Sequence, residues 1–196
     1  MKTNTNPSIS TQEKIIELAT QMVRTRGFNA FSYRDLSEAL GIKTSSIHYY
    51  FASKDDLGVA IMSAYHDDLM QTLDGFEAQG LGYLAQYHAW VNLFVGNDGA
   101  KSLLCLGGMF ASDIATVSAD VRDKTMAFFT DVERWLAVLF ENGRAAGDFS
   151  FAGSAQRLAQ VVFSTLQGAL SSARLFDAPE RVLGAAGELE GLFVKR

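Results

Sequence analysis

The 196-residue chain contains only two prolines, Pro7 and Pro179. Proline removes a backbone N–H and clashes with the preceding helical turn, so its scarcity leaves nearly the whole chain free to be helical. Apolar residues recur at helical spacing in successive segments, and glycine or polar residues separate these segments. The patterns predict an all-α fold of about nine helices.

Three capping boxes occur near the N-terminus. In this motif a serine side chain and an acidic side chain three residues later each bind a backbone N–H at the start of a helix. The boxes are Ser10 with Glu13, Ser32 with Asp35, and Ser53 with Asp56. They predict a compact helical head over residues 1–52, from which the helix after Ser53 leads into a larger helical body over residues 53–196.

The helices of the body are predicted from apolar periodicity. The segments are 54–77, 83–95, 103–115, 121–146 and 152–176, followed by a last helix that Asp177 caps and that carries Pro179 in its first turn. Residues 96–99, which read Gly-Asn-Asp-Gly, are expected to break the chain after the second of these segments.

Two short helices in the head are joined by a turn that contains glycine. Gly41 ends the helix over residues 34–40, because a residue without Cβ readily takes the left-handed conformation that closes a helix. The next helix offers N-capping hydroxyls from Thr44, Ser45 and Ser46 and an apolar stripe of Ile47, Tyr50 and Phe51. Small hydroxyls, aromatic rings and a cation point outwards, which is typical of the helix-turn-helix that reads double-stranded DNA.

The same stretch resembles a known family. It reads Phe28-x-x-Phe31-Ser-Tyr-Arg-Asp-Leu-Ser-Glu-Ala-Leu-Gly-Ile and continues Ser-Ser-Ile-His-Tyr-Tyr-Phe51-x-Ser-Lys54-x-x-Leu57. Over roughly residues 11–57 it is similar to the DNA-binding half of the TetR family of one-component bacterial repressors. One departure is His48, which stands where the family most often has tyrosine, although a histidine still donates to a phosphate. The resemblance implies a helix-turn-helix domain at 1–52 and a ligand-binding and dimerisation domain at 53–196.

Nine residues are candidate DNA contacts. Lys43 and Lys54 are expected to bind phosphates, the latter at a helix N-terminus, where backbone N–H groups also favour an anion. Ser45 and Tyr49 are the leading candidates for base edges. The full set is Tyr33, Arg34, Lys43, Thr44, Ser45, Ser46, His48, Tyr49 and Lys54. The alternative is that these are ordinary exposed residues of a small helical domain.

The charge distribution supports a DNA-facing head. The chain has a net charge of −5, but residues 1–50 carry six basic and four acidic side chains, whereas the remainder carries eleven basic and eighteen acidic ones. An acidic body is repelled by phosphates and stays clear of the duplex. A structural DNA-bending protein would need basic residues over the whole chain. The longest apolar runs are too short for a membrane span and no signal segment is visible, so we expect a cytoplasmic protein.

The body contains aromatic residues on several predicted helices. The family resemblance implies an effector cavity there, and the candidates to line it are Tyr65, Tyr87, Trp90, Phe94, Cys105, Phe110, Phe128, Trp135, Phe163 and Arg174. A small apolar or aromatic effector is expected. The alternative is that these rings form an ordinary core, which is the commoner role of an aromatic stripe at helical spacing.

Cys105 is the one cysteine of the chain, so no intrachain disulfide can form. Ser102-Leu-Leu-Cys-Leu-Gly-Gly and the following Ala111-Ser-Asp-Ile114 resemble family members that sense electrophiles or oxidants through a cysteine at the start of this helix. A thiol in the first helical turn has its pKa lowered by the helix dipole, and a cation such as Arg174 would add to this effect. The alternative is a small buried hydrophobic residue.

The last two predicted helices carry many small residues. These are Gly168, Ala169 and Ser172 in one and Gly184, Ala185, Gly187 and Gly191 in the other. Glycine costs about 1 kcal/mol against alanine inside a helix, which suggests that other helices approach closely. In the family these helices form a four-helix bundle between two subunits, so we expect a homodimer. The alternative is a monomer in which they cover the core.

No nucleophile with a base, phosphate loop or metal-ligand spacing is visible, so no catalytic residue, cofactor or metal is expected. A small helical enzyme or ligand carrier that keeps the helix-turn-helix as a scaffold is the alternative from another class. The favoured interpretation is a dimeric repressor that occupies a palindromic operator and is released by a small effector or by modification of Cys105.

Overall fold

The computed structural model describes residues 10–95 and 104–194. Within these ranges the chain forms nine α-helices, as the sequence predicts, and one short 3-10 helix that was not predicted. The elements are α1 (Thr11–Arg26), η1 (Phe28–Ala30), α2 (Tyr33–Leu40), α3 (Thr44–Tyr50), α4 (Lys54–Ala78), α5 (Tyr83–Val95), α6 (Leu106–Ser112), α7 (Ala119–Ala146), α8 (Ala155–Phe176) and α9 (Glu180–Glu190). The predicted break over residues 96–99 lies outside the described residues.

The predicted capping boxes are all present. The side chains of Ser10, Ser32 and Ser53 each accept a hydrogen bond from the backbone N–H three residues on, and the acidic partner binds the cap N–H in return. Gly41 ends α2 in the left-handed conformation with φ of 66°, as expected. These local signals therefore set the boundaries of the helices in the head.

Two predicted caps are wrong. Residue Lys43 occupies the N-cap of α3 without any side-chain bond, and the Thr44 hydroxyl donates to Ser37 instead. Asp177 does not start α9 but ends α8 in the left-handed conformation, with φ of 49°, and Pro179 is the N-cap of α9. An aspartate tolerates this conformation better than most residues, so it suits the end of a helix as well as a start.

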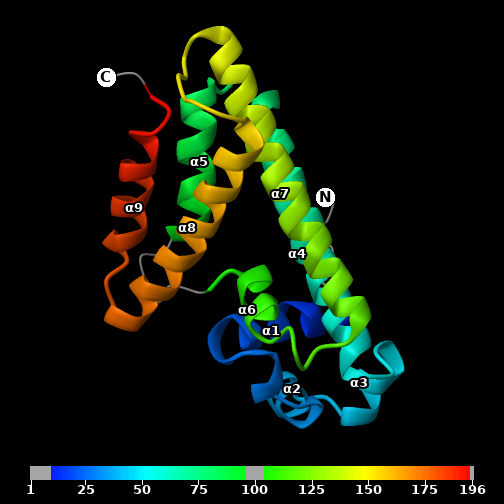
Figure 1. Ribbon diagram of the computed structural model, residues 1–196. Helices are drawn as coiled ribbons and strands as arrows, with labels where there is room; N and C mark the ends of the chain where they lie inside the picture. Colours follow the sequence, from blue (N-terminus) through cyan, green and yellow to red (C-terminus); the bar gives the residue numbers. More distant parts are fainter. Residues whose placement is uncertain (1–9, 96–103, 195–196) are drawn as a thin grey trace, which may run out of the picture.

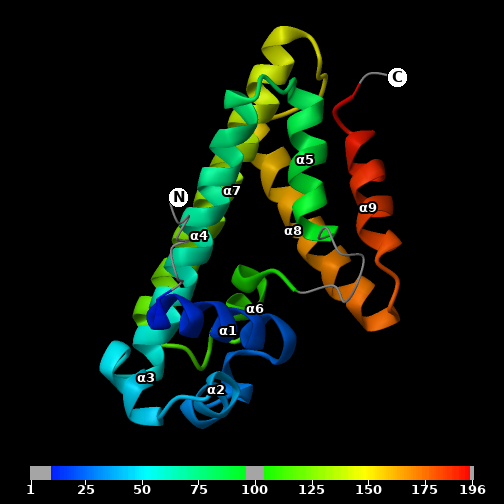
Figure 2. The ribbon, with the colours of Figure 1, turned by 180° about the vertical axis from the view of Figure 1, so that it is seen from behind.

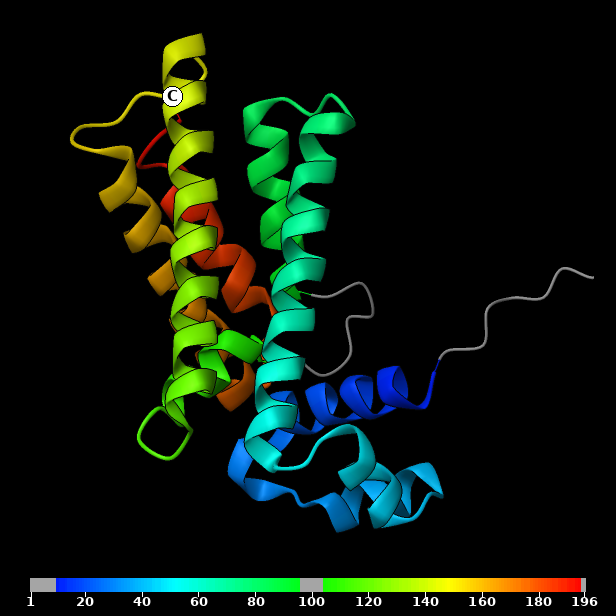
Figure 3. The same ribbon diagram turned by 90° about the vertical axis from the view of Figure 1, so that its right-hand side faces the viewer.

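The helices form a head and a tall body. In Figure 1, α1, α2 and α3 lie together at the bottom, while α4 and α7 run side by side up one edge of the molecule. Figure 3 shows the same two helices as upright columns with the head beneath α4. On the other side α8 packs between α7 and α9, and α5 contacts α7 and α9. The short α6 lies directly against α1, which Figure 2 shows from behind.

Apolar contacts form part of the packing between the head and the body. The Phe28 ring lies 5.1 Å from the Phe110 ring of α6, measured between centroids. On α4, a Cβ added to Gly58 would lie 2.9 Å from Cγ2 of Val121 and 3.1 Å from Cζ of Phe28. A glycine is therefore needed where α4, α7 and the head converge.

Three of the predicted glycines in the last two helices have no close neighbour within this chain. A Cβ added at Gly168, Gly184 or Gly187 would have no neighbour within 4 Å. The expected close approach of another helix to these glycines is therefore absent inside one subunit. The tight glycines lie elsewhere, at Gly107 against the Phe128 ring and at Gly143 against the Phe149 ring.

We expect Gly143→Ala to destabilise the protein. A Cβ there would lie 2.2 Å from Cδ2 of Phe149, a buried ring, so that a well-packed site would be overfilled. The expected loss is about 1–3 kcal/mol in the free energy of unfolding, measured by urea titration at fixed protein concentration. The control is Gly75→Ala on α4, where a Cβ meets only Gln79 at 3.7 Å and where about 1 kcal/mol of stabilisation is expected. Equal stability of the two variants would contradict the packing.

Candidate DNA-binding surface and effector cavity

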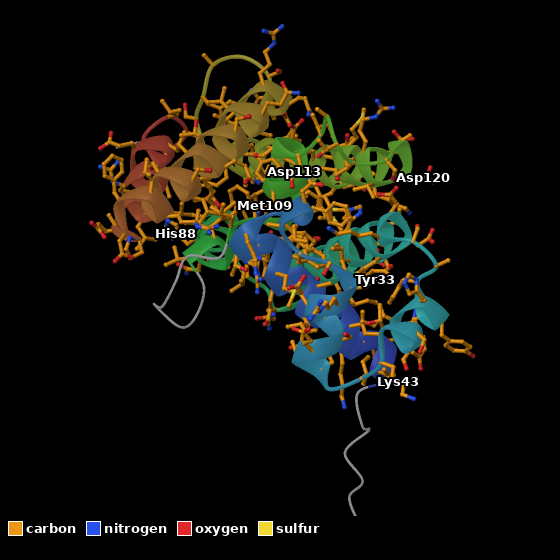
Figure 4. All side chains as sticks on the ribbon, turned by 90° about the horizontal axis from the view of Figure 1, so that it is seen from below. Tyr33, Lys43, His88, Met109, Asp113 and Asp120 are labelled. Atoms are coloured by element: carbon orange, nitrogen blue, oxygen red, sulfur yellow. The ribbon has the colours of Figure 1, made fainter. Side chains whose placement is uncertain are left out.

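Helix α3 presents a polar and aromatic face at the far end of the head. Ile47 is fully buried and holds the helix against α1 and α2, whereas Tyr49 is 83 % exposed. The other exposed residues of the predicted set on and before this helix are Lys43, Ser45 and His48, while Thr44 and Ser46 are half-buried. Figure 4 looks at the head from below and places Lys43 at its outer edge, away from the body. This exposed row has the size and chemistry to enter a major groove.

Tyr33 supports α3 from behind. Its hydroxyl donates to the backbone oxygens of Phe51, at 3.1 Å, and of Ser53, so that it spans the junction between α3 and α4. Its ring meets the His48 ring edge-on at 4.8 Å. Burial, together with the negative charges of Asp56 and Asp55, raises the pKa of Tyr33 to about 12. The neutral hydroxyl is thus fixed as a donor to the backbone, and a contact of Tyr33 with DNA stays a prediction.

Lys54 also has partners inside the head. Its ammonium group donates to the backbone oxygen of Phe31 and lies 4.8 Å and 4.4 Å from the ring centroids of Phe28 and Phe31. Burial lowers the pKa of Lys54, and the nearby carboxylates of Asp35 and Asp113 oppose this shift. The cation therefore ties the start of α4 to the loop before α2, and a phosphate contact remains a prediction for it.

Arg34 lies on the exposed surface of α2. Its Nε is 2.8 Å from Oε1 of Glu38, one helical turn away, and both side chains are well exposed. The hydrogen bond and the charge of Glu38 raise the pKa of Arg34. An exposed pair of this kind contributes little to stability, so the guanidinium can exchange its partner for a phosphate at small cost.

A small cavity lies in the body just above the head. Its volume is about 30 Å³, which is room for one or two water molecules. Its lining comes from α1, α4, α5, α7, α8 and the residue before α6, and consists of Arg24, Tyr65, Leu69, Trp90, Leu93, Phe94, Cys105, Phe128, Val132, Phe163 and Leu170. Aromatic and aliphatic groups form most of the wall, and the polar groups gather where Arg24, Tyr65 and Cys105 meet.

The cavity brings together six of the ten residues predicted for it. These are Tyr65, Trp90, Phe94, Cys105, Phe128 and Phe163. The other four do not line the cavity and have contacts elsewhere. The Tyr87 hydroxyl donates to the backbone oxygen of Ala186, and the Phe110 ring packs on Phe28. Trp135 packs on Phe76 and Trp90, and Arg174 donates to backbone oxygens at the end of α1. Their periodicity places them in the core without telling which wall they join.

Sequence reasoning missed five lining residues. Leu69 follows Tyr65 by one helical turn, and Val132 follows Phe128 in the same way. Both could therefore have been predicted, because residues four positions apart lie on the same face of a helix. Leu93 and Leu170 lie on helices that were already assigned to the cavity. No pattern in the sequence points to Arg24, which belongs to a helix of the head.

Cys105 is the N-cap of α6 and is only 6 % exposed. The Tyr65 hydroxyl donates to its Sγ at 3.8 Å, and burial raises the pKa of Tyr65. The neighbouring cation is Arg24, whose Nε donates to the backbone oxygen of Leu104 at 2.7 Å, rather than the predicted Arg174. A groove of about 330 Å³ between α6 and α8 also includes Cys105 and Leu170 in its lining, so these two residues separate the groove from the cavity.

The head and the full chain are similar to known transcriptional regulators. Residues 15–61 match the sequence profile of the family described as bacterial regulatory proteins, tetR family. The HTH-type transcriptional repressor NemR of Escherichia coli is 25 % identical over 194 residues, with 96 % of each chain covered. A TetR transcriptional regulator from Legionella pneumophila is 30 % identical with a TM-score of 0.83, and the match covers 95 % of this chain and 98 % of that one.

A further solved structure supports the same fold. A TetR-family regulator from Agrobacterium tumefaciens superposes with a TM-score of 0.88 at 28 % identity, covering 92 % of this chain and 96 % of that one. None of the helices in the described ranges is long and apolar enough to cross a membrane.

We expect Tyr33→Phe to change how stability depends on pH. The folded chain keeps the Tyr33 proton up to a pKa of about 12, whereas the unfolded chain loses it near the ordinary value of 10.0. The contribution to the unfolding free energy is therefore complete below pH 10 and declines as the pH rises towards 12. The variant should be about 1–3 kcal/mol less stable at neutral pH, because two backbone oxygens lose their donor. It should also show a shallower decline above pH 10 in urea titrations.

The exposed Tyr49→Phe variant is the control and should follow the wild type at each pH. A Tyr33→Phe variant with unchanged stability at neutral pH would show that its hydroxyl does not hold the junction between α3 and α4.

Proposed function

Because the chain belongs to the TetR family of transcriptional regulators, we propose that it is a repressor that binds a palindromic operator as a homodimer and is released by a small effector. The observation that carries this proposal is the pairing of an exposed α3 with a cavity in whose wall the head and the body meet. The related E. coli protein is named a repressor, which supports the sign of the regulation. As a transcriptional regulator it acts by binding DNA and not by catalysis.

The DNA-binding set keeps its predicted members with different roles. Lys43, Ser45, His48 and Tyr49 are exposed and are proposed to meet the duplex directly. Tyr33 and Lys54 are proposed to hold α3 and the start of α4 at the right angle, since their polar atoms bind the backbone of the head. Phosphate contacts would fix the register, and Ser45 and Tyr49 would read base edges.

The dimer is supported by the outer surface of α8 and α9. Large apolar side chains are exposed there, including Leu175 at 78 % and Phe176 at 61 %, together with Val161 and Leu183, and Leu192 is exposed just after α9. The glycines at 168, 184 and 187 have open space beside them in one subunit, so a second copy can approach closely. Two half-sites about 34–36 Å apart need two copies of a helix-turn-helix, so a dimer is required to bind both half-sites of a palindromic operator.

The effector is proposed to be a small apolar or aromatic molecule. Aromatic rings from α4, α5, α7 and α8 surround the cavity, and its few polar groups lie at one end. Such a wall orients a flat ligand by ring stacking and a small number of hydrogen bonds. We propose that the repressor acts on its operator in the cytoplasm.

A second candidate is control by covalent modification of Cys105. The thiol lies between the cavity and the groove along α6 and α8, so a reagent that enters either space comes next to it. Its burial favours the effector proposal, because a thiolate needs access to react. Both candidates use the same helix and the same junction with the head.

The operator test uses selection from random duplex DNA at stated salt, followed by binding measurements on the selected sequence. We expect an inverted repeat. Lys43→Ala should lower the affinity about 5- to 150-fold and reduce the salt dependence by about one counterion, because one phosphate contact is lost. Tyr49→Ala should lower the affinity by a similar factor without reducing the salt dependence. Lys124→Ala, an exposed body residue, is the matched control and should bind like the wild type.

Both head variants should unfold within about 0.5 kcal/mol of the wild type, because the substituted side chains are exposed. Retained affinity in both would contradict the assignment of α3 as the recognition helix. Failure to enrich any sequence with the wild type would contradict the repressor itself.

The cysteine alternative is tested on the same operator. We expect wild-type protein treated with N-ethylmaleimide to stay bound, because Cys105 is buried and Tyr65 donates to its sulfur. Release of the treated wild type, with retention by treated Cys105→Ser, would instead favour control by thiol modification. Labelling of the thiol is followed by mass spectrometry. This measurement distinguishes a Cys105 that did not react from one that reacted without changing operator binding.

A further inference from the structure

Arg24 belongs to the last turns of α1, yet its side chain forms part of the cavity wall in the body. Among the described lining residues it is the one contributed by the head. The cavity therefore touches the DNA-binding domain directly, without the intervening length of α4. A change in the shape of this wall at Arg24 therefore acts directly on α1.

The contacts of Arg24 join three parts of the molecule. Its Nε donates to the backbone oxygen of Leu104 at 2.7 Å, just before α6, and its guanidinium lies 5.8 Å from the centroid of the Tyr65 ring on α4. Its own backbone oxygen accepts a hydrogen bond from Arg174 of α8 at 3.1 Å, and Arg174 also donates to the backbone oxygen of Thr25. Two arginines thus fasten the C-terminal end of α1 to the body.

The size of the cavity makes this fastening sensitive to a ligand. About 30 Å³ is far below the roughly 300–1,000 Å³ of typical small-molecule sites, so an organic effector enters only if lining side chains move. Leu104 and Cys105 precede α6, and the aromatic rings of the wall pack against one another. The guanidinium of Arg24 reaches the wall from another domain through a flexible stem, so it can move while the rings of the wall keep their packing.

We propose that Arg24 reports the filling of the cavity to the DNA-binding domain: a ligand ring beside Tyr65 displaces the guanidinium from the Leu104 carbonyl and loosens the end of α1. This inference rests on the proposed function, because it assumes that operator binding depends on how the head is held. In the empty state the bond from Arg24 to Leu104 holds the arrangement that binds DNA. The effect of a ligand is limited to its preference for the loosened state, typically 5- to 150-fold in affinity.

The test replaces the ligand by a side chain. Val132 is fully buried on α7 and lines the cavity, so Val132→Phe places a ring in a space that cannot hold one. Leu136→Phe, one turn further along α7 and also fully buried, is the matched control because Leu136 does not line the cavity. Arg24→Met keeps an apolar stem and removes the hydrogen bond to Leu104. Full-length variants are compared for operator affinity, thermal unfolding and dimer mass.

We expect Val132→Phe and Arg24→Met each to lower operator affinity at least tenfold. The double variant should have the same affinity as whichever single variant binds the operator less tightly. Leu136→Phe should change affinity less than threefold. Amide hydrogen exchange in α1 should become faster in Val132→Phe and Arg24→Met and stay at the wild-type rate in the control. Coupled effects of this kind identify two changes that act on one step.

Additive losses in the double variant, or unchanged exchange in α1, would overturn the role of Arg24. Tighter operator binding by Arg24→Met would overturn it as well, since the fastened state would then be the one that does not bind DNA. If Arg24→Met unfolds, Arg24→Lys replaces it, because lysine keeps the charge and lacks the Nε donor. Failure of the wild type to bind any operator would instead contradict the proposed function. The experiment therefore distinguishes failure of the proposed function from failure of the role of Arg24.

Discussion

The arrangement of the whole molecule depends on the contact between the end of α1 and the segment from α6 to α7. The backbone N–H of Phe28 donates to Oδ2 of Asp113 at 3.0 Å, and the Asn29 amide donates to the Thr116 hydroxyl at 2.7 Å. The Phe28 ring fills the space left by Gly58. Figure 4 shows Asp113 at the centre of this junction. Polar bonds give the contact direction, and the buried ring gives it stability, so the head is held in one orientation while its outer face stays clear of the body.

Local signals predicted the helices well because a capping box or a terminal glycine acts within one turn of its own chain. The caps at Ser10, Ser32 and Ser53 depend on residues three positions away, and the structure has them all. Asp177 shows the limit of such signals, because the same side chain suits the end of one helix and the start of the next. Only the path of the chain between α8 and α9 decides between them.

The candidate sites were predictable to different degrees. The exposed row on α3 follows from one buried residue, Ile47, which fixes how the short helix is turned. For Lys54 the sequence predicts a phosphate contact, which stays a prediction, but it does not reveal the contacts with Phe28 and Phe31, which are distant in sequence. The cavity depends on contacts between six segments, and Arg24 reaches it only because α1 crosses beneath α6. Helical periodicity reports which face is buried and not which partner covers it, so such contacts are visible only in the folded structure.

Helix α4 runs from the cavity wall down to the end that is joined to α3. It contains 25 residues, so at 1.5 Å per residue it is about 37 Å long. Tyr65 and Leu69 of the cavity wall lie near its middle, and α3 is attached to its lower end. Tyr65 lies about 16 Å along the helix from Lys54, so a rotation of α4 by about 5° about Tyr65 would move the lower end by roughly 1.4 Å. If the proposed function holds, a tilt of α4 by about 10° at the cavity moves α3 by roughly 3 Å, which is close to the 3.4 Å rise between base pairs of a duplex.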